Sequence, residues 1–422
     1  MTTETTTDWK AIDNLLLDPH WYAQGNFHDT YRILRQEDPI HWTEDERYGH
    51  PYWAITTYAH IREIQDRWDM FSSRIGTPVP PRSGKRIPPE QRHQMGLDTS
   101  IATLDPPLHR IYRRPINKHF SVPAIAKLTD LADRIVDDLI NEVADKDEFD
   151  FAQEVAAELP MRLVLGFIGV PEEDWKSLQA STNRYALHAD PAVTIDNDPI
   201  KTMEIGRAEL SEYAIALAED RAKNPRDDLA SKVGKLKVDG DYLSPHEVKN
   251  WFINFILGGL ETSINGLGTG MWQFIENPDQ RDLLLSDPSL VSNAVEEVLR
   301  WGSPSRVQCR VVNEDLDFHG KEMKAGDWVM LFAASGNRDE TVWEEPDRFN
   351  IGRELIDHLS FGEGIHKCLG RNLIRLEMAR FFPKFLAAFP KLSLAGEPVW
   401  NVDYHGNGFK RLPVTHNNVV VR

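Results

Sequence analysis

The chain contains very little cysteine: among its 422 residues there are only two, Cys309 and Cys368. Two cysteines are too few for the disulfide framework of a small secreted protein. The sequence also has no run of about 18 apolar residues, so we expect no transmembrane helix. Its N-terminus is polar and acidic, and it lacks the basic and apolar stretches of a signal peptide. These absences together predict a protein of the reducing cytoplasm, where free thiols persist.

Basic residues are outnumbered by acidic ones, 48 to 66, which gives a formal charge of −18 at pH 7. We therefore expect no nucleic-acid binding, because there is no basic excess to neutralise phosphates. No Gly-x-Gly-x-x-Gly motif is present, so we predict no flavin or nicotinamide site in the chain itself. No Gly/Ser-rich or charged linker divides the sequence, and the proline-rich residues 78–89 are interpreted as a surface loop. We predict a single domain over residues 1–422.

The most informative residue is Cys368, which closes a glycine-rich loop directly before a predicted helix. A thiol at a helix N-terminus lies in positive potential, which lowers its pKa and favours the metal-binding thiolate. A single cysteine is better suited to be the axial ligand of a haem iron than to form a zinc site, because structural zinc takes four protein ligands. Gly362 and Gly364 would permit a tight turn at positive φ, and Gly370 would let a flat macrocycle approach. The plain alternative is a buried, inert cysteine at a loop–helix junction.

Two helices are predicted with defined ends. The first spans residues 245–276, because Ser244 and Glu247 form a capping box at its start and Pro278 follows its end. The second spans residues 371–388, where apolar residues recur at helical spacing directly behind the cysteine loop. The first helix is long enough to cross a whole domain, so we expect much of it to be central.

The middle of the first helix contains Gly258, Gly259, Glu261 and Thr262. Each glycine inside a helix costs about 1 kcal/mol relative to alanine, so the pair needs a reason. One interpretation is close helix packing, with Glu261 at the surface and Thr262 bonding back to a carbonyl. The other is a groove for a diatomic ligand, with the Thr262 hydroxyl beside it and Glu261 starting a proton relay.

These two segments resemble motifs of one family. The run from Phe361 to Gly370, with His366 and Cys368 inside it, resembles the haem-binding signature of the cytochromes P450. The run from Gly258 to Thr262 is similar to the acid–alcohol motif of the family's central helix, with glycine in place of the commoner alanine. The resemblance continues, in chain order, from about residue 105 to 413. It implies the P450 fold, which is mostly α (α+β), with a helical domain and a small β-rich side.

The resemblance also implies a set of site residues. Glu297 and Arg300 match a Glu-x-x-Arg pair whose third member would be Arg348, although such a pair is commonly a surface ion pair. A solvated basic face is the alternative interpretation of His109 and Arg113. The residues that the family would place at the haem are Cys368 as iron ligand, the propionate-binding His109, Arg113, Arg310 and His366, and, lining the macrocycle, Phe361, Gly362, Gly258 and Gly370.

By the same resemblance, the chain would bind haem b, activate O2 reductively and hydroxylate a small, mainly apolar substrate. Thr262 and Glu261 would be its catalytic residues. Electrons would come from a ferredoxin of the 2Fe-2S type and an NAD(P)H-dependent ferredoxin reductase, and the enzyme would be a cytoplasmic monomer. A peroxide-driven or NO-reducing haem-thiolate enzyme and a non-catalytic haem sensor or electron carrier are the alternatives.

Separate parts of the chain are expected to select the substrate and to bind the redox partner. Substrate choice would lie in residues 75–101, 181–200, 303–309 and 405–409. Arg306, in the third of these segments, would either point to solvent or pair with a carboxylate, or reach the pocket and bind a substrate carboxylate or carbonyl. The redox partner would dock on the side of the haem where Cys368 lies. By the resemblance, the two segments that flank the haem there contain six cations: Arg110, Arg113, Arg114, Lys118, Lys367 and Arg371.

Overall fold

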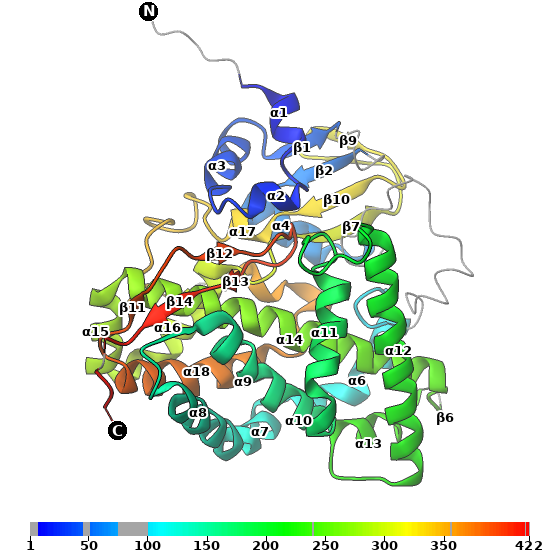
Figure 1. Cartoon of the computed structure of the whole chain (residues 1–422). Coiled ribbons are helices and arrows are strands. Elements are labelled where there is room, and N and C mark those ends of the chain that lie inside the picture. The colour runs from blue at the N-terminus through cyan, green and yellow to red at the C-terminus, as the bar shows by residue number, and fades with distance from the viewer. Residues whose placement is uncertain are drawn as a thin grey trace, which may run out of the picture.

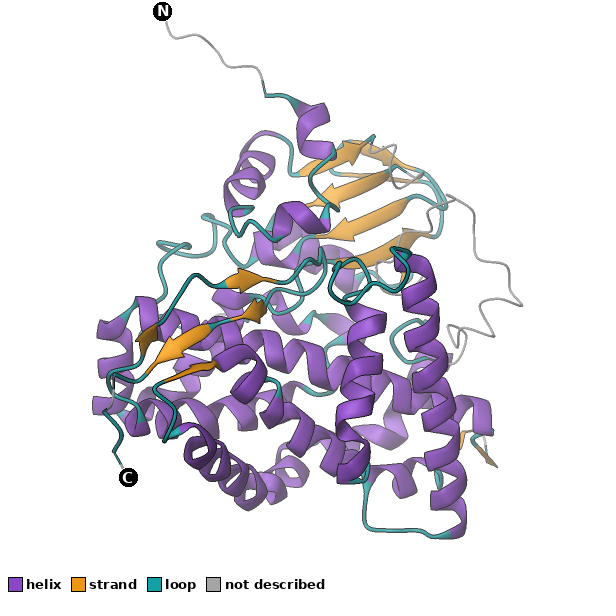
Figure 2. Ribbon diagram, viewed as in Figure 1, coloured by secondary structure: helices purple, strands orange, loops and turns teal. Residues whose placement is uncertain are grey.

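A computed structural model describes most of the chain, namely residues 7–44, 51–74, 100–238, 240–354, 357–417 and 419–421. Helices fill most of this structure, and the strands form one five-stranded sheet and several small ones (Figures 1 and 2). The predicted mostly helical fold with a small β-rich side is therefore confirmed. The proline-rich stretch 78–89 and most of the predicted specificity loop 75–101 lie outside the described residues.

The elements follow one another in a fixed order along the chain. The α-helices are α1 (Trp9–Asp13), α2 (Pro19–Tyr22), α3 (His28–Glu37), α4 (Tyr58–Asp66), α6 (Leu108–Asn117), α7 (Val122–Ile125), α8 (Thr129–Val143), α9 (Glu158–Pro160), α10 (Gly166–Ile168), α11 (Trp175–Ala186), α12 (Pro199–Lys223), α13 (Leu229–Val233), α14 (Pro245–Glu276), α15 (Pro278–Ser286), α16 (Val291–Gly302), α17 (Ala333–Gly336) and α18 (Arg371–Ala388). The strands are β1 (Ile40–Thr43), β2 (Tyr52–Ile55), β3 (Phe71–Ser72), β4 (Glu148–Asp150), β5 (Lys237–Val238), β6 (Asp241–Tyr242), β7 (Gln308–Val312), β8 (Leu316–Phe318), β9 (Lys321–Met323), β10 (Trp328–Leu331), β11 (Ser393–Leu394), β12 (Val399–Trp400), β13 (Phe409–Arg411) and β14 (Pro413–Thr415).

Helix α14 is the central element of the helical part (Figure 1). It has 32 residues, and the predicted capping box is present at its start, where the Ser244 hydroxyl accepts from the Glu247 N–H and the Glu247 side chain accepts from the Ser244 N–H. Asn277 caps its other end, directly before Pro278. At 1.5 Å per residue the helix is roughly 48 Å long. Both predicted ends of this helix are thus confirmed.

Helix α18 starts behind the cysteine loop, and its predicted range is also confirmed. One side of it is buried, with Leu373, Met378, Phe381 and Phe385 in the largest apolar core of the described residues. It packs against α8 and α16, and α16 in turn packs against α14. Because these helices share one core, the N-terminus of α18 is held in a fixed position relative to the middle of α14.

The main sheet joins the N-terminal segment of the chain with residues 308–331. Its strand order is β1-β2-β10-β7-β3, and β2 pairs with β10 in parallel, with Ile55 opposite Leu331. Strands β8, β9 and β10 follow one another along residues 316–331, with positive φ at Gly320 and Gly326 where the chain turns.

Apolar clusters cover both faces of this sheet. One cluster packs it against α1, α2 and α3, and the other packs it against α4. None of the helices in the described residues combines the length and the hydropathy that a membrane-crossing segment needs.

Candidate functional site

Cys368 lies in a tightly folded loop in front of α18. Gly362 and Gly364 have φ values of 63° and 68°, a region that is open to glycine, as predicted. The Cys368 N–H donates to the Phe361 carbonyl at 2.8 Å and closes the loop. The Phe361 ring is buried, and the Arg375 guanidinium lies 4.5 Å from its centroid. These contacts fix the sulphur next to the first turn of α18.

The electrostatics of the Cys368 thiol combine two opposing effects. Burial raises its pKa, while the backbone N–H groups of Gly370 and Arg371 and the guanidinium groups of Arg113 and Arg371 act in the opposite direction. The predicted lowering of this pKa is therefore wrong, because the loss of water outweighs the positive helix N-terminus. The donors still stabilise a charged sulphur, and a metal ion bound to it would supply the remaining stabilisation of the thiolate.

Two histidines and a buried arginine meet beside the cysteine loop. The rings of His109, on α6, and His366 lie 4.3 Å apart between centroids. Both ring nitrogens of His109 and Nε2 of His366 are buried and have no hydrogen-bond partner in the described part of the chain. Burial lowers the pKa of His109 to about 4 and that of His366 to about 2, and Arg310 lowers the latter further. Unpaired buried donors next to a buried guanidinium fit the oxygen atoms of an anionic group.

Arg113 is placed differently from the other predicted propionate ligands. Its guanidinium donates to the Ile365 carbonyl at 3.1 Å and to the Lys367 carbonyl, both in the cysteine loop. Its Nε donates to Asn117 at 3.4 Å. Arg113 therefore ties α6 to the backbone of the loop that contains Cys368, and the solvated basic face that was the alternative does not describe it.

The two adjacent glycines of α14 have different surroundings. A Cβ atom at Gly259 would lie 2.7 Å from Cγ1 of Val164, so this glycine permits close packing. A Cβ atom at Gly258 would meet no atom within 4 Å, and the same is true at Gly370. The Thr262 hydroxyl donates to the Gly258 carbonyl at 2.9 Å. Close packing therefore explains Gly259, while the space at Gly258 is compatible with the groove, which stays a prediction.

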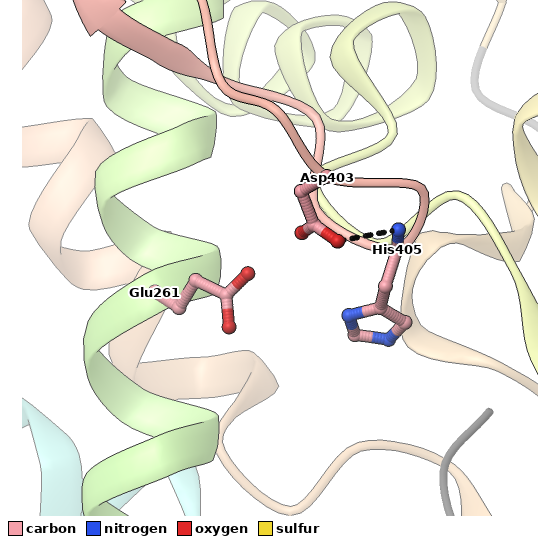
Figure 3. Close-up of side chains that lie close together, drawn as sticks. All are labelled: Glu261, Asp403 and His405. Atoms are coloured by element: carbon pink, nitrogen blue, oxygen red, sulfur yellow. Dashed lines mark hydrogen bonds between the residues drawn. The ribbon is translucent and has the colours of Figure 1, made fainter. Parts of the chain in front are cut away.

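Glu261 faces the loop of residues 401–408 between β12 and β13, rather than the surface. Figure 3 shows its carboxyl group pointing toward Asp403 and His405, and the ligand atoms of the three residues lie within 4.8 Å of one another. Burial raises the pKa of Glu261 to about 8, and the charge of Asp403 adds to this effect. The predicted surface position of Glu261, the first alternative, is therefore wrong.

Arg306 corrects another prediction. Its side chain is fully buried and donates to the Asp403 carbonyl at 2.8 Å, to the Gly406 carbonyl, and to the Asn407 side chain at 2.8 Å. Its guanidinium also stacks 4.7 Å from the ring centroid of Tyr22. Solvent exposure and a substrate-binding role do not match this position. The third alternative, a carboxylate partner, is partly met, because Asp403 and Glu261 interact with the guanidinium electrostatically while its hydrogen bonds hold the 401–408 loop in place.

The buried ion pair of α16 has a different third member from the predicted one. Arg300 donates twice to the Glu297 carboxylate, at 2.7 and 2.8 Å, and both side chains are buried. Arg353 also reaches Glu297, at 3.4 Å, whereas the Arg348 side chain is 57% exposed and pairs with Glu345. The assignment of Arg348 is wrong because a charge pattern alone does not tell which of two arginines, five residues apart, turns inward.

Sequence reasoning missed four residues at or near the site. Glu377, on α18, is buried and accepts from the Ser263 hydroxyl at 2.9 Å, and burial raises its pKa to about 8. A single glutamate within the apolar pattern of residues 371–388 was the signal for it. Asp403 had no comparable signal, because more than a hundred residues separate it from Glu261, and His405 was named only as part of the predicted specificity segment 405–409. The missed residues are Arg353, Glu377, Asp403 and His405.

The residues beside the cysteine loop fit a haem. The iron could bind the single thiol of Cys368. The haem carboxylates could accept hydrogen bonds from the unpaired nitrogens of His109 and His366 and from the Arg310 guanidinium. At Gly258 and Gly370 the missing side chains leave room for a flat group, since no atom lies within 4 Å of the Cβ position. A zinc site would need more protein ligands than this loop contains.

Comparison with known proteins gives a consistent result. The family model for Cytochrome P450 matches residues 284–415, which include Cys368. The chain is 32% identical over 407 residues to a methyl-branched lipid omega-hydroxylase of Mycobacterium bovis, with 94% of this chain and 92% of the relative covered. It is also 32% identical to a vitamin D(3) 25-hydroxylase of Pseudonocardia autotrophica, with 96% of this chain and 98% of the relative covered.

The fold agrees with these relationships. A Mycobacterium marinum cytochrome P450 in complex with pseudoionone superposes with a TM-score of 0.85, at 27% identity, and the match covers 93% of this chain and 95% of that one. Relatives above 30% identity therefore span nearly the whole chain, and the structural likeness extends over the same range. The chain belongs to the cytochrome P450 family and is a monooxygenase with haem iron as its cofactor.

Proposed function

We propose that this monooxygenase binds haem b through Cys368 and uses O2 to hydroxylate a small, mainly apolar organic molecule. It would act as one domain and receive electrons from a 2Fe-2S ferredoxin and an NAD(P)H-dependent reductase. The observation that carries the proposal is the cysteine loop, in which a lone thiol at a helix N-terminus lies near the unpaired His109 and His366. Relatives named for methyl-branched lipids and vitamin D(3) support a lipophilic substrate.

The protein groups would hold the cofactor at two places. Cys368 would bind the iron, and His109, His366 and Arg310 would donate charge-assisted hydrogen bonds to the propionates. Arg113 would fix the loop that presents the sulphur, through its bonds to the Ile365 and Lys367 carbonyls. When bound, a haem iron with a thiolate ligand activates O2 for insertion into a C–H bond, because the thiolate donates electron density to the metal.

Thr262 and Glu261 would assist proton transfer beside the site where O2 binds: Thr262 would accept a hydrogen bond and Glu261 would donate a proton. The Thr262 O–H donates to the Gly258 carbonyl, so the lone pairs of its oxygen remain available to accept a hydrogen bond. Glu261, whose pKa burial raises to about 8, is protonated at neutral pH and can release a proton. Since the two residues are adjacent in α14, a hydrogen-bond acceptor and a proton donor lie in the same turn.

Labelled oxygen tests the proposed reaction directly. With a ferredoxin, its reductase, NADPH and ¹⁸O2, we expect one labelled oxygen atom in each hydroxylated product. The compounds to try first are lipophilic molecules selected by a substrate-induced shift of the haem spectrum. Product formed equally fast with hydrogen peroxide and no reductant would instead assign the protein to the peroxide-driven class.

Replacing Thr262 with alanine is expected to uncouple the reaction. The variant should bind substrate and accept electrons normally, but the yield of product per NADPH should fall about tenfold, as expected for one lost hydrogen bond of about 1.4 kcal/mol. Hydrogen peroxide release should rise in proportion, and both yields are measured in one assay. Thr269→Ala is the matched control, because Thr269 makes the same bond, at 2.8 Å, to a carbonyl four residues earlier. An unchanged product yield in Thr262→Ala would remove Thr262 from the relay.

The redox partner is proposed to dock over α6, which Arg113 ties to the cysteine loop. Of the six cations predicted for this face, Arg110, Arg114 and Lys118 are exposed. The other three are engaged in the loop: Arg113 and Arg371 donate to its carbonyls, and Lys367 lies 3.4 Å from Glu363. The exposed three would attract an acidic ferredoxin.

Charge reversal at Arg114 tests this face. We expect Arg114→Glu to slow reduction by ferredoxin about 3–10-fold at low salt, with the difference shrinking as ionic strength rises. Lys10→Glu is the control, since Lys10 is also exposed but lies on α1, far from α6 (Figure 1). Stopped-flow reduction rates at several salt concentrations measure the effect. Equal slowing by both substitutions would mean that net charge, and not this face, controls the encounter.

A further inference from the structure

The carboxyl group of Glu261 lies against that of Asp403 in the 401–408 loop, and a side-chain hydrogen bond with Asp403 is one of the causes that raise the pKa of Glu261. A Cβ atom at Gly406 would lie 2.4 Å from Oε1 of Glu261 and 2.7 Å from Oδ2 of Asp403, so both oxygens border the same point. Oε1 of Glu261 is buried, and the described residues offer it no N–H or O–H donor. Ionised carboxylates only accept hydrogen bonds, so the two groups can bond to one another only with a proton between them.

The hydrogen-bond donors near Asp403 and Glu261 determine which of the two carboxyl groups is ionised. The Asp403 carboxylate accepts from the His405 N–H at 2.9 Å and from the Gly406 N–H at 2.5 Å, and both donors stabilise the ionised form. The Arg306 guanidinium reaches this loop from the segment before β7 and donates to the Asp403 carbonyl. Glu261 has no such donors on Oε1. The negative charge therefore belongs on Asp403 and the proton on Glu261.

We propose that Asp403 is a positioning residue for the monooxygenase reaction: it shares one proton with Glu261 and thereby keeps a protonated carboxyl group next to Thr262. The inference rests on the proposed function of Glu261 as proton donor. Gly406 makes the pair possible, because any side chain at this position would separate the two carboxyl groups.

The charged groups that face Glu261 are consistent with this arrangement. Burial raises the pKa of Glu261 to about 8, Asp403 raises it further and Arg306 opposes this. From α11, Tyr185 also lies near Glu261, and burial raises its pKa, so it stays neutral. Burial lowers the pKa of His405, whose Nε2 is 3.0 Å from the Ser305 hydroxyl.

The same three ligand groups, Glu261, Asp403 and His405, have the spacing of a metal site. The charges around the three groups are unfavourable for a cation there. The buried Arg306 guanidinium and the Asp403 carboxylate have opposite charges and interact electrostatically, while protonated Glu261 and neutral His405 add no charge. A divalent ion would have to displace the proton and lie beside a buried guanidinium, which is unfavourable in a site with little water.

Infrared spectroscopy of the haem-loaded protein tests the shared proton without turnover. The background variant is Glu377→Gln, which removes the other buried carboxyl group near α14 whose pKa is raised to about 8. In this background we expect a protonated-carboxyl band at pH 7 that disappears as the pH passes about 8. Adding Glu261→Gln should abolish the band. Adding Asp403→Asn should keep it but shift its titration to lower pH by about one unit or more, because a like charge has been removed.

The coupling of turnover provides an independent readout. As pH rises through the pKa of Glu261, the donor is lost and the product yield per NADPH should fall. This fall should come at lower pH in Asp403→Asn and in Gly406→Ala, whose methyl group enters the space between the carboxyl groups. A band or a pH profile that neither substitution shifts would overturn the proposal. A shifting band in a protein that incorporates no oxygen from O2 would leave the shared proton standing and refute the proposed function instead.

Discussion

Cys368→Ala is expected to abolish both the iron–sulphur bond and oxygen insertion. The ferrous–CO complex of the wild-type protein should show the strongly red-shifted Soret band of a thiolate ligand, and the variant should lose this band completely. Catalysis should fall below detection, because electron donation by the thiolate is what favours cleavage of the O–O bond. The optical spectrum and the turnover assay can be measured on the same sample.

Cys309→Ala is the matched control, since Cys309 is the only other cysteine of the chain. It is buried on β7, and burial raises the pKa of its thiol to about 12, so it is not a thiolate at neutral pH. We expect an unchanged Soret band and a loss of unfolding free energy of about 1 kcal/mol, as for a small buried apolar group. A red-shifted band in Cys368→Ala that disappeared only in Cys309→Ala would reverse the assignment.

Glu297→Ala is expected to be the most destabilising single substitution proposed here. It leaves Arg300, 1% exposed, and Arg353, 12% exposed, without the carboxylate that neutralises them. Removing one partner of a buried ion pair costs about 3–5 kcal/mol, a large part of the stability of an ordinary domain. The carboxylate also accepts from the Asn350 N–H at 2.9 Å, so residues 344–353 would lose an anchor as well. Urea titration measures the free energy of unfolding.

Two arginine substitutions identify the third member of the triad. Arg353→Ala should lose about 1–3 kcal/mol, because its guanidinium also donates to the Glu345 and Arg348 carbonyls. Arg348→Ala should stay within about 0.5 kcal/mol of the wild type, as is usual for an exposed ion pair. The reverse order of the two effects would restore the assignment made from the sequence alone.

The elements that local signals define were predicted correctly. Helix α14 has its ends where Ser244 and Pro278 place them, and α18 follows the apolar pattern behind Cys368. The positive φ values of Gly362 and Gly364 were also readable, since glycine spacing reports on turns. Signals of this kind depend on a few neighbouring residues, so no tertiary information is needed to interpret them.

The contacts that depend on the tertiary fold could not be predicted. Asp403 meets Glu261 only because α14 passes the β12–β13 loop, and no pattern in either segment encodes this approach. Arg306 was misjudged for the same reason, since its acceptors are backbone carbonyls that carry no sequence signature. The thiol pKa was misjudged because helix position was visible in the sequence and burial was not.

The parallel pairing of β2 with β10 has a consequence for synthesis on the ribosome. Trp53 donates to Asp327, a residue 274 positions later, and β10 separates β2 from the other strands that follow it in the sheet. At 5–20 residues per second, the first hairpin waits roughly 15–55 s for its neighbour. During this time one of its edges remains open to other chains. We therefore expect the emergence of β10 from the ribosome, rather than haem capture, to set the earliest moment at which this sheet can close, and chaperones to bind the nascent N-terminal segment until then.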